Sequence, residues 1–335
     1  MQKHYKNVKK LKNFYTNEFE VGDIIVDNGT IAYMGKNKES EHEKIDLSEH
    51  IVIPSFKNYH CDARGLPSSE IENLIYENVK AGVTDIIVVT DSFLFTKFVL
   101  EKYNLNYKLA ITLQDAKELS DLDKEKILVY VDPALDEESE LDEASDFAGK
   151  NELKVFINMF DNLELVGELN SKTKKLPINY IEEFGLLDRG GYISGAICSD
   201  KEDYNLINQY DFEIIVRPMR DLRKGNGFAN IIQIQNAGLP VSVGTHDDMH
   251  IDMFQIARTL LLGTRGLLCD ECAINENEVL SVICTKELEE KTKANFIVLD
   301  TKFDEENIIQ NIINSANKED IMLTIANGEI IKRED

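Results

Sequence analysis

The sequence predicts an α/β protein built as a (β/α)8 TIM-like barrel, with a small β-sandwich module formed by both chain termini. Hydrophobic β-type runs alternate with amphipathic helical segments through the middle of the 335-residue chain, which is the pattern of a parallel sheet covered by helices. Both ends carry short β-type runs around an Asn-Gly pair. A doubly wound open sheet is the alternative, but no GxGxxG or Walker loop follows any predicted strand.

The terminal segments are predicted to form two β-hairpins. Asn28 and Gly29 lie between two apolar runs in DIIVDNGTIAYMG, and the pair Asn327 and Gly328 does so in IMLTIANGEIIKRED. An Asn-Gly pair in this setting is a strong short-range hairpin signal. Neither end alone is long enough to bury a core, so we expect one composite module. The predicted domains are 1–52 together with 290–335 for the β module, and 53–289 for the barrel.

Eight apolar runs are the predicted barrel strands, near residues 55–60, 84–90, 107–113, 126–131, 152–158, 191–197, 212–217 and 239–245. The segments between them have helical periodicity. In SSEIENLIYENVKAG, Ser69 and Glu72 predict a capping box, and Gly82 predicts the end of the helix. The apolar positions of this helix and of the one after the eighth strand are Ile71, Leu74, Ile75 and Val79, and Met253, Ile256, Ala257, Leu260 and Leu261.

Charge and cysteine content narrow the partners and the compartment. A formal net charge of −24 repels phosphate backbones and anionic lipids, so we expect no nucleic-acid or membrane partner. No apolar run approaches the roughly 18 residues of a membrane helix, and MQKHYKNVKK lacks the apolar stretch of a signal peptide. We expect a cytoplasmic protein with reduced thiols and a small-molecule substrate or ligand, and a homo-oligomer stays open. The lone CxxC at 269–272 predicts a helix-to-loop turn, with a structural metal as the alternative.

Polar side chains gather where the first and eighth predicted strands end. His60 and Asp62 are two residues apart and point to one face of the first strand, and His246 follows the eighth. In a closed barrel the chemistry lies at the carboxyl ends of the strands, and the first and last strands are neighbours. Two histidines and one carboxylate suit zinc or iron with open coordination positions. We therefore predict a divalent metal on these three residues, with a polar, metal-free pocket as the alternative.

Six segments resemble, in order, the amidohydrolase superfamily: DIIVDNGTIAYMG, VIPSFKNYHCD, AGVTDIIVVTD, LPINYIEEFGLL, GLPVSVGTHDDMHIDMFQIA and KANFIVLD. The similar branch contains chlorohydrolases and nucleoside deaminases, including methylthioadenosine and S-adenosylhomocysteine deaminases. The resemblance spans nearly the whole chain, with a shorter and poorly matched stretch at 92–150. It implies a barrel with a β module from both termini, and hydrolysis of a carbon–nitrogen bond other than a peptide bond.

The resemblance also shows which metal-ligand positions differ. The branch holds its metal with HxH after strand 1, the His of HxxE after strand 5 and the Asp of a GTD motif after strand 8. Here His60 is kept, Asp62 stands at the second histidine of HxH, and GTD ends in His246. The two exchanges compensate each other, which favours a rebuilt metal site over random decay. Asp247 is the alternative ligand if the alignment shifts by one residue.

The strand 5 and strand 6 positions carry further candidates. HxxE is replaced by Asn158 to Asp161, so Asn158 is a predicted weak ligand through its carbonyl oxygen. Asp161 is the catalytic candidate for moving protons, and an exposed loop acid is the alternative. Ser194 falls near the strand 6 histidine and cannot replace it as a base. Because Asp161 is one methylene shorter than Glu, activity on the family's usual purines is predicted to be lost unless the backbone shifts.

Two arginines follow the seventh predicted strand. Arg217 and Arg220, in RPMRDLRKG, are predicted to bind a carboxylate or phosphate of the substrate, and a solvated loop paired with surface acids is the alternative. Two functions follow from these patterns. One is a deaminase-type, metal-dependent amidohydrolase with an altered metal site. The other is a catalytically inactive relative that serves ligand binding or association.

Overall fold

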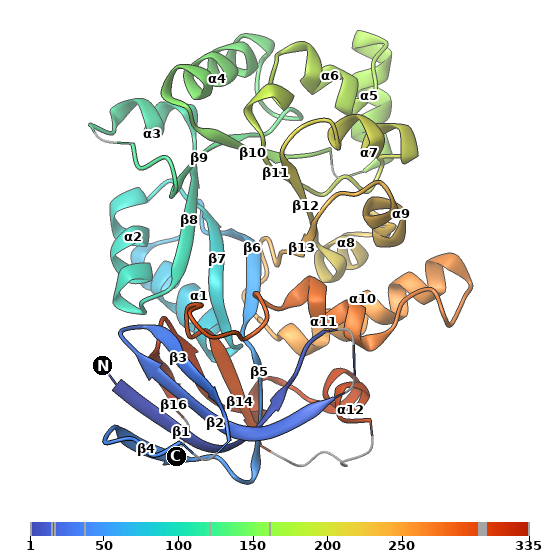
Figure 1. The fold of residues 1–335 in the computed structure, drawn as a ribbon. Helices are drawn as coiled ribbons and strands as arrows, with labels where there is room; N and C mark the ends of the chain where they lie inside the picture. The colour runs from blue at the N-terminus through green and yellow to red at the C-terminus, as the bar shows by residue number, and fades with distance from the viewer. Residues whose placement is uncertain are drawn as a thin grey trace.

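The protein is described by a computed structural model that covers residues 2–14, 16, 18–36, 38–120, 122–160, 162–300 and 307–333. Two eight-stranded sheets organise the chain, one drawn above the other in Figure 1. In the upper sheet, the strands lie in sequence order and all neighbouring pairs are parallel. They are β6 (Phe56–Asp62), β7 (Val83–Val89), β8 (Asn106–Ile111), β9 (Ile127–Val131), β10 (Lys154–Asn158), β11 (Gly191–Ser194), β12 (Phe212–Val216) and β13 (Val241–Val243).

The upper sheet closes into a barrel between its first and last strands. A parallel bridge pairs Cys61 with His246, and the amide of Asp62 donates to the carbonyl oxygen of His246 at 2.9 Å. The barrel interior is filled by apolar and aromatic side chains, among them Tyr130 and Phe156, whose rings stack at 6.1 Å. This packed interior leaves the carboxyl ends of the strands as the place for a site. The predicted barrel is confirmed.

Helices cover the outside of the barrel (Figure 1). They are α1 (Ser68–Lys80), α2 (Phe93–Lys102), α3 (Leu113–Glu118), α4 (Glu138–Asn151), α5 (Leu163–Thr173), α6 (Pro177–Glu183), α7 (Lys201–Ile207), α8 (Pro218–Lys224), α9 (Ile231–Asn236), α10 (Met253–Leu268) and α11 (Glu276–Ile283), with α12 (Ile308–Ser315) near the C-terminus. The apolar positions predicted for the first helix and for the helix after the eighth strand are all buried in α1 and α10. In the described part of the chain, no helix is both long and apolar enough to cross a membrane.

Three local predictions need correction. The capping box of Ser69 and Glu72 is wrong, because α1 begins at Ser68 after Pro67 and no side chain caps it. Gly82 does follow the end of this helix with a φ of 80°. The sixth strand ends at Ser194 instead of 197, since Gly195 and Ala196 have positive φ and turn the chain. The eighth strand is likewise shorter than predicted and ends at Val243.

The lower sheet is built from both chain ends. Its strands are β1 (Gln2–Leu11), β2 (Phe19–Asp27), β3 (Thr30–Gly35), β4 (Glu43–Asp46), β5 (His50–Pro54), β14 (Phe296–Asp300), β15 (Ile321–Ala326) and β16 (Glu329–Arg333). The two ends meet where β5 pairs antiparallel with β14, with Val52 opposite Val298. Both predicted hairpins are present as β2–β3 and β15–β16. The composite terminal module is confirmed, while the domain limits at 52/53 and 289/290 stay a prediction.

The predicted turn at residues 269–272 follows α10. Cys269 is the left-handed residue that ends this helix, and the thiols of Cys269 and Cys272 are exposed and free. This placement agrees with a helix-to-loop turn.

Gly244 allows the close approach of the last strand to the first. A Cβ atom at this position would lie 2.6 Å from Cβ of His60, closer than packed carbon atoms can approach. We expect Gly244→Ala to lower the free energy of unfolding by about 2 kcal/mol or more, because the β6–β13 contact must open. Gly167→Ala is the matched control, since its added Cβ meets nothing within 4 Å. Urea unfolding checks both, and equal stability of the two variants would contradict this account.

Candidate functional site

The candidate site lies where β6, β11, β12 and β13 end. His60 and Asp62 belong to β6, and His246 follows β13 by three residues. The amides of Thr245 and His246 both donate to the carbonyl oxygen of His60, at 2.9 and 2.6 Å. These bonds hold His246 in the left-handed region, with a φ of 56°, which is uncommon for a residue other than glycine. The backbone that closes the barrel therefore also sets the two imidazoles side by side, with ring centroids 4.4 Å apart.

The structure places the three predicted metal ligands together. One potential ligand atom from each of His60, Asp62 and His246 lies within 4.8 Å of the other two. Ligands of one zinc ion, at about 2.0–2.2 Å from it, are separated by roughly 3–4 Å. Only a small contraction would let this set hold an ion. Neither Asp247 nor His250 belongs to this group among the described residues.

The two imidazoles are neutral at pH 7. Burial lowers the pKa of His60 well below its usual range, with further lowering by His246 and Arg217. Burial, followed by the charges of Arg220 and Arg217, lowers the pKa of His246 to about 4. Neutral imidazole is the form that binds metal ions. The site therefore presents two histidines ready to act as ligands.

Ser194 positions the ring of His60. Its Oγ lies 2.6 Å from Nδ1 of His60, whereas Nε2 of His60 is buried and has no hydrogen-bond partner among the described residues. When Nδ1 carries the proton and donates to Ser194, the lone pair of Nε2 is available to a metal. Ser194 thus acts through His60, in keeping with the expectation that it cannot replace a base.

Asp62 is held by an arginine that sequence reasoning missed. Nε and Nη2 of Arg64 donate to the two carboxylate oxygens of Asp62 at 3.0 and 2.7 Å, and the Arg64 amide adds a third bond. The guanidinium of Arg64 lies 4.4 Å from the centre of the Tyr130 ring. Asp62 is therefore fixed in place, but it already has a cationic partner.

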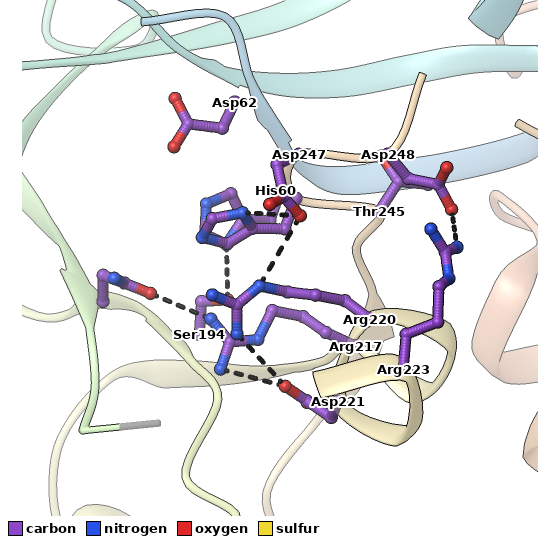
Figure 2. A network of polar contacts seen from close by, with 12 residues as sticks. His60, Asp62, Ser194, Arg217, Arg220, Asp221, Arg223, Thr245, Asp247 and Asp248 are labelled. Atoms are coloured by element: carbon purple, nitrogen blue, oxygen red, sulfur yellow. Dashed lines mark hydrogen bonds and ion pairs between the residues drawn. The ribbon is translucent and has the colours of Figure 1, made fainter. Parts of the chain in front are cut away.

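Arg217 fills the centre of the barrel mouth. Its side chain is completely buried, donates to Oδ1 of Asn158 at 2.9 Å and pairs with Asp221 at 3.4 Å. Gly195 makes room for it, since a Cβ there would lie 2.7 Å from Nη2 of Arg217. Figure 2 shows Arg217 and Arg220 on one side of His60, with Asp62 on the other. The alternative of a solvated loop is wrong for Arg217.

Asn158 is engaged at both ends of its amide. Oδ1 accepts from Arg217, and Nδ2 donates to Oδ2 of Asp132 at 2.9 Å. Burial raises the pKa of Asp132. Hydrogen bonds from Asn158 and Tyr130 to its carboxylate partly offset this increase. The bond to Arg217 uses one of the two lone pairs of Oδ1, and a ligand role for Asn158 stays a prediction.

Asp247 and Arg220 lie at the rim of the site. Asp247 is half exposed and contacts Nδ1 of His246 at 3.4 Å and Nε of Arg220 at 3.7 Å. Arg220 also reaches Asp221, and its substrate role, like that of Arg217, stays a prediction. Asp161, the predicted proton carrier, lies outside the described residues. His250 is exposed.

The charges around the donors bear on whether a divalent ion fits. Three guanidinium groups pair with three carboxylates at the mouth: Arg64, Arg217 and Arg220 with Asp62, Asp221 and Asp247. These six charges cancel. Each added positive charge about 5 Å from a guanidinium costs roughly 3 kcal/mol at the effective dielectric of a partly buried site. The donor set therefore fits a divalent metal in chemistry and spacing, and three guanidinium groups lie around it.

The sequence interpretation did not identify three residues that form polar contacts in the site: Arg64, Asp132 and Asp221. Asp132 directly follows β9, so its position at a strand end was an available signal. Arg64 lies two residues after Asp62 in the loop that follows β6, and Asp221 lies one turn into α8 from Arg217. Their partners depend on side-chain directions that spacing alone does not give.

Protonation of His246 should weaken the fold in acid. Its pKa is lowered in the folded state, so the unfolded chain takes up the proton first as pH falls below about 6.5, and stability is lost down to about pH 4. With EDTA present, the wild type should lose about 2 kcal/mol more than His246→Asn between pH 7.5 and pH 5, measured by urea unfolding. Asn tolerates the left-handed conformation. His250→Asn should behave as wild type, and an unchanged pH slope in His246→Asn would contradict the assignment.

Comparisons with known proteins agree with the fold and the sequence resemblance. No protein-family model matches the chain. A 5-methylthioadenosine/S-adenosylhomocysteine deaminase of Bacillus cytotoxicus is 23% identical over 210 residues, which are 57% of this chain and 48% of the relative. The chain thus spans about half the length of the curated relatives it matches.

Solved structures extend the similarity to the whole fold. An adenosine deaminase from Xanthomonas campestris with bound zinc gives a TM-score of 0.84 at 13% identity, over 98% of this chain and 92% of that one. A guanine deaminase from C. acetobutylicum with guanine in its active site gives 0.82 at 17% identity, over 99% and 100%. The predicted resemblance is confirmed: in sequence and in fold, this chain is similar to the deaminase-like branch of the amidohydrolase superfamily.

Proposed function

We propose that the protein is a metal-dependent hydrolase of the amidohydrolase type, which acts on a carbon–nitrogen bond of a small molecule and holds its metal with His60, Asp62 and His246. The observation that supports this is the convergence of their donor atoms within 4.8 Å. A buried polar atom without a partner is costly, and a metal would give Nε2 of His60 the partner it lacks. The deaminases among the relatives support the same reaction class.

Each neighbouring residue has a part in this proposal. A divalent metal, zinc rather than iron by analogy with the adenosine deaminase structure, would supply the Lewis acidity that makes water a nucleophile near neutral pH. Ser194 fixes the tautomer of His60, and Arg64 orients Asp62. Asp161 would carry a proton to the leaving amine.

The outer candidates keep lesser roles in the proposal. Asn158 would join the metal through the second lone pair of Oδ1, beside its bond to Arg217, and Asp247 is a rim carboxylate next to His246. Arg220, with its side chain largely buried at the mouth and Arg217 behind it, would face an anionic group of the substrate. The substrate therefore combines a hydrolysable amine or amide with a negative charge.

The second candidate is a catalytically inactive relative that uses the barrel for ligand binding or association. One observation favours it: each of the three arginines at the mouth already pairs with a carboxylate. A site built in this way is electrostatically satisfied as a metal-free pocket. Metal content separates the two candidates more directly than a substrate screen does.

Protein purified without chelator and equilibrated with added zinc should bind about one zinc per chain by elemental analysis, because the donor set is retained. His60→Gln and His246→Gln should each lose that metal. His250→Gln is the matched control and should keep it, since His250 is exposed and outside the donor group. Melting curves confirm folding of each variant. Metal that survives both ligand substitutions would place the ion elsewhere, and folded, metal-free wild type would favour the inactive relative.

If the metal-loaded protein releases ammonia from S-adenosylhomocysteine, which carries a carboxylate, or from another anionic amine or amide, Asp161→Asn should lower kcat by about 100-fold or more, because an amide cannot carry the proton. Its metal content should not change. Activity should also fall at acid pH as the histidine ligands take up protons. An Asp161→Asn variant with full kcat would remove Asp161 from the reaction.

A further inference from the structure

The position of Arg217 relative to the metal donors is unusual for a cation. Its side chain is completely buried, and it enters the mouth from the end of β12 at the start of α8. Its Nη2 lies against Gly195, the residue after Ser194, whose Oγ lies 2.6 Å from Nδ1 of His60, and Figure 2 shows Arg217 next to His60. The guanidinium of Arg217 is therefore held beside the donor atoms that are proposed to bind the metal ion.

The surrounding residues are arranged to keep Arg217 there. Asn158, at the end of β10 two strands away, accepts from Nη1 at 2.9 Å, and Asp221 supplies a buried countercharge at 3.4 Å. Gly195 leaves the space that Nη2 occupies. Such a group cannot turn away from an incoming ion without losing contacts on β10 and on α8. Its repulsion is therefore built into the site rather than relaxed on binding.

We propose that Arg217 is an internal cation that holds the metal affinity of His60, Asp62 and His246 low, so that the metal exchanges with its surroundings instead of staying permanently bound. This inference rests on the metal site of the proposed function. It adds that the affinity is set by a charge outside the ligand set. Removal of that charge, with the ligands intact, should raise the affinity.

The test measures zinc affinity by competition with a chromophoric chelator, with zinc ion alone as the probe. Arg217→Met removes the charge at similar length and should bind zinc about 100-fold more tightly than the wild type, since a buried like charge is removed. Arg217→Lys keeps the charge and should stay within about tenfold of the wild type. Arg223→Met is the matched control, because Arg223 is an exposed arginine of the same helix, paired with Asp248, and should leave affinity unchanged.

Folding must be separated from charge, since Arg217→Met removes one partner of Asn158 and one of Asp221. Arg217→Gln offers an amide to both residues and provides a second neutral variant, and melting curves identify the variants that fold. Zinc binding by a folded neutral variant must also depend on His60, as shown by combination with His60→Gln. Tighter, His60-dependent binding in either neutral variant supports the inference.

The failures are distinguishable. Wild type that binds zinc through His60 as tightly as the folded neutral variants would overturn the role of Arg217 and leave the proposed function standing. If neither the wild type nor the neutral variants bind zinc at millimolar concentration, the metal site itself is overturned. This inference then falls with it. Equal tightening in Arg223→Met would assign the effect to overall charge and would also overturn the inference.

Discussion

A few backbone hydrogen bonds between β6 and the residues that follow β13 connect the fold to the site. The carbonyl oxygen of His60 accepts from both Thr245 and His246, and the amide of Asp62 donates back to His246. These bonds close the barrel, and the same residues carry the imidazoles and the carboxylate. Gly244 permits the contact because it has no Cβ. His60, Asp62 and His246 cannot separate unless these hydrogen bonds break and the barrel opens. The interactions that stabilise the sheet therefore also maintain the geometry of the site.

Charge compensation is the second constraint at the mouth. A buried guanidinium requires partners, because an unpaired buried charge costs several kcal/mol. Arg217 obtains them from Asn158 and Asp221, and Asn158 continues through Asp132 to β9. The polar contacts thus run across several strand ends. They give the mouth rigidity, and they set the electrostatic conditions under which an added cation has to bind.

The terminal module depends on contacts that are distant in sequence. β5 from the N-terminal part pairs with β14 from the C-terminal part, and Oγ1 of Thr324 on β15 donates to the carbonyl oxygen of Val79 in α1 at 3.2 Å. Apolar residues of β14 and β15, such as Ile297 and Ile321, share the core that contains the barrel helices. The two chain ends therefore pack against one side of the barrel (Figure 1).

The sequence by itself determined the barrel, the composite terminal sheet and both hairpins, because hydrophobic period and Asn-Gly turns are local signals. It also named His60, Asp62 and His246 as a group, since strand ends in a closed barrel converge. Only the tertiary structure decided which charges surround them. The burial of Arg217, its bond to Asn158 and the grip of Arg64 on Asp62 depend on side-chain directions and on space left by Gly195. Such features arise from packing between residues that are distant in the sequence, and they cannot be predicted from residue spacing.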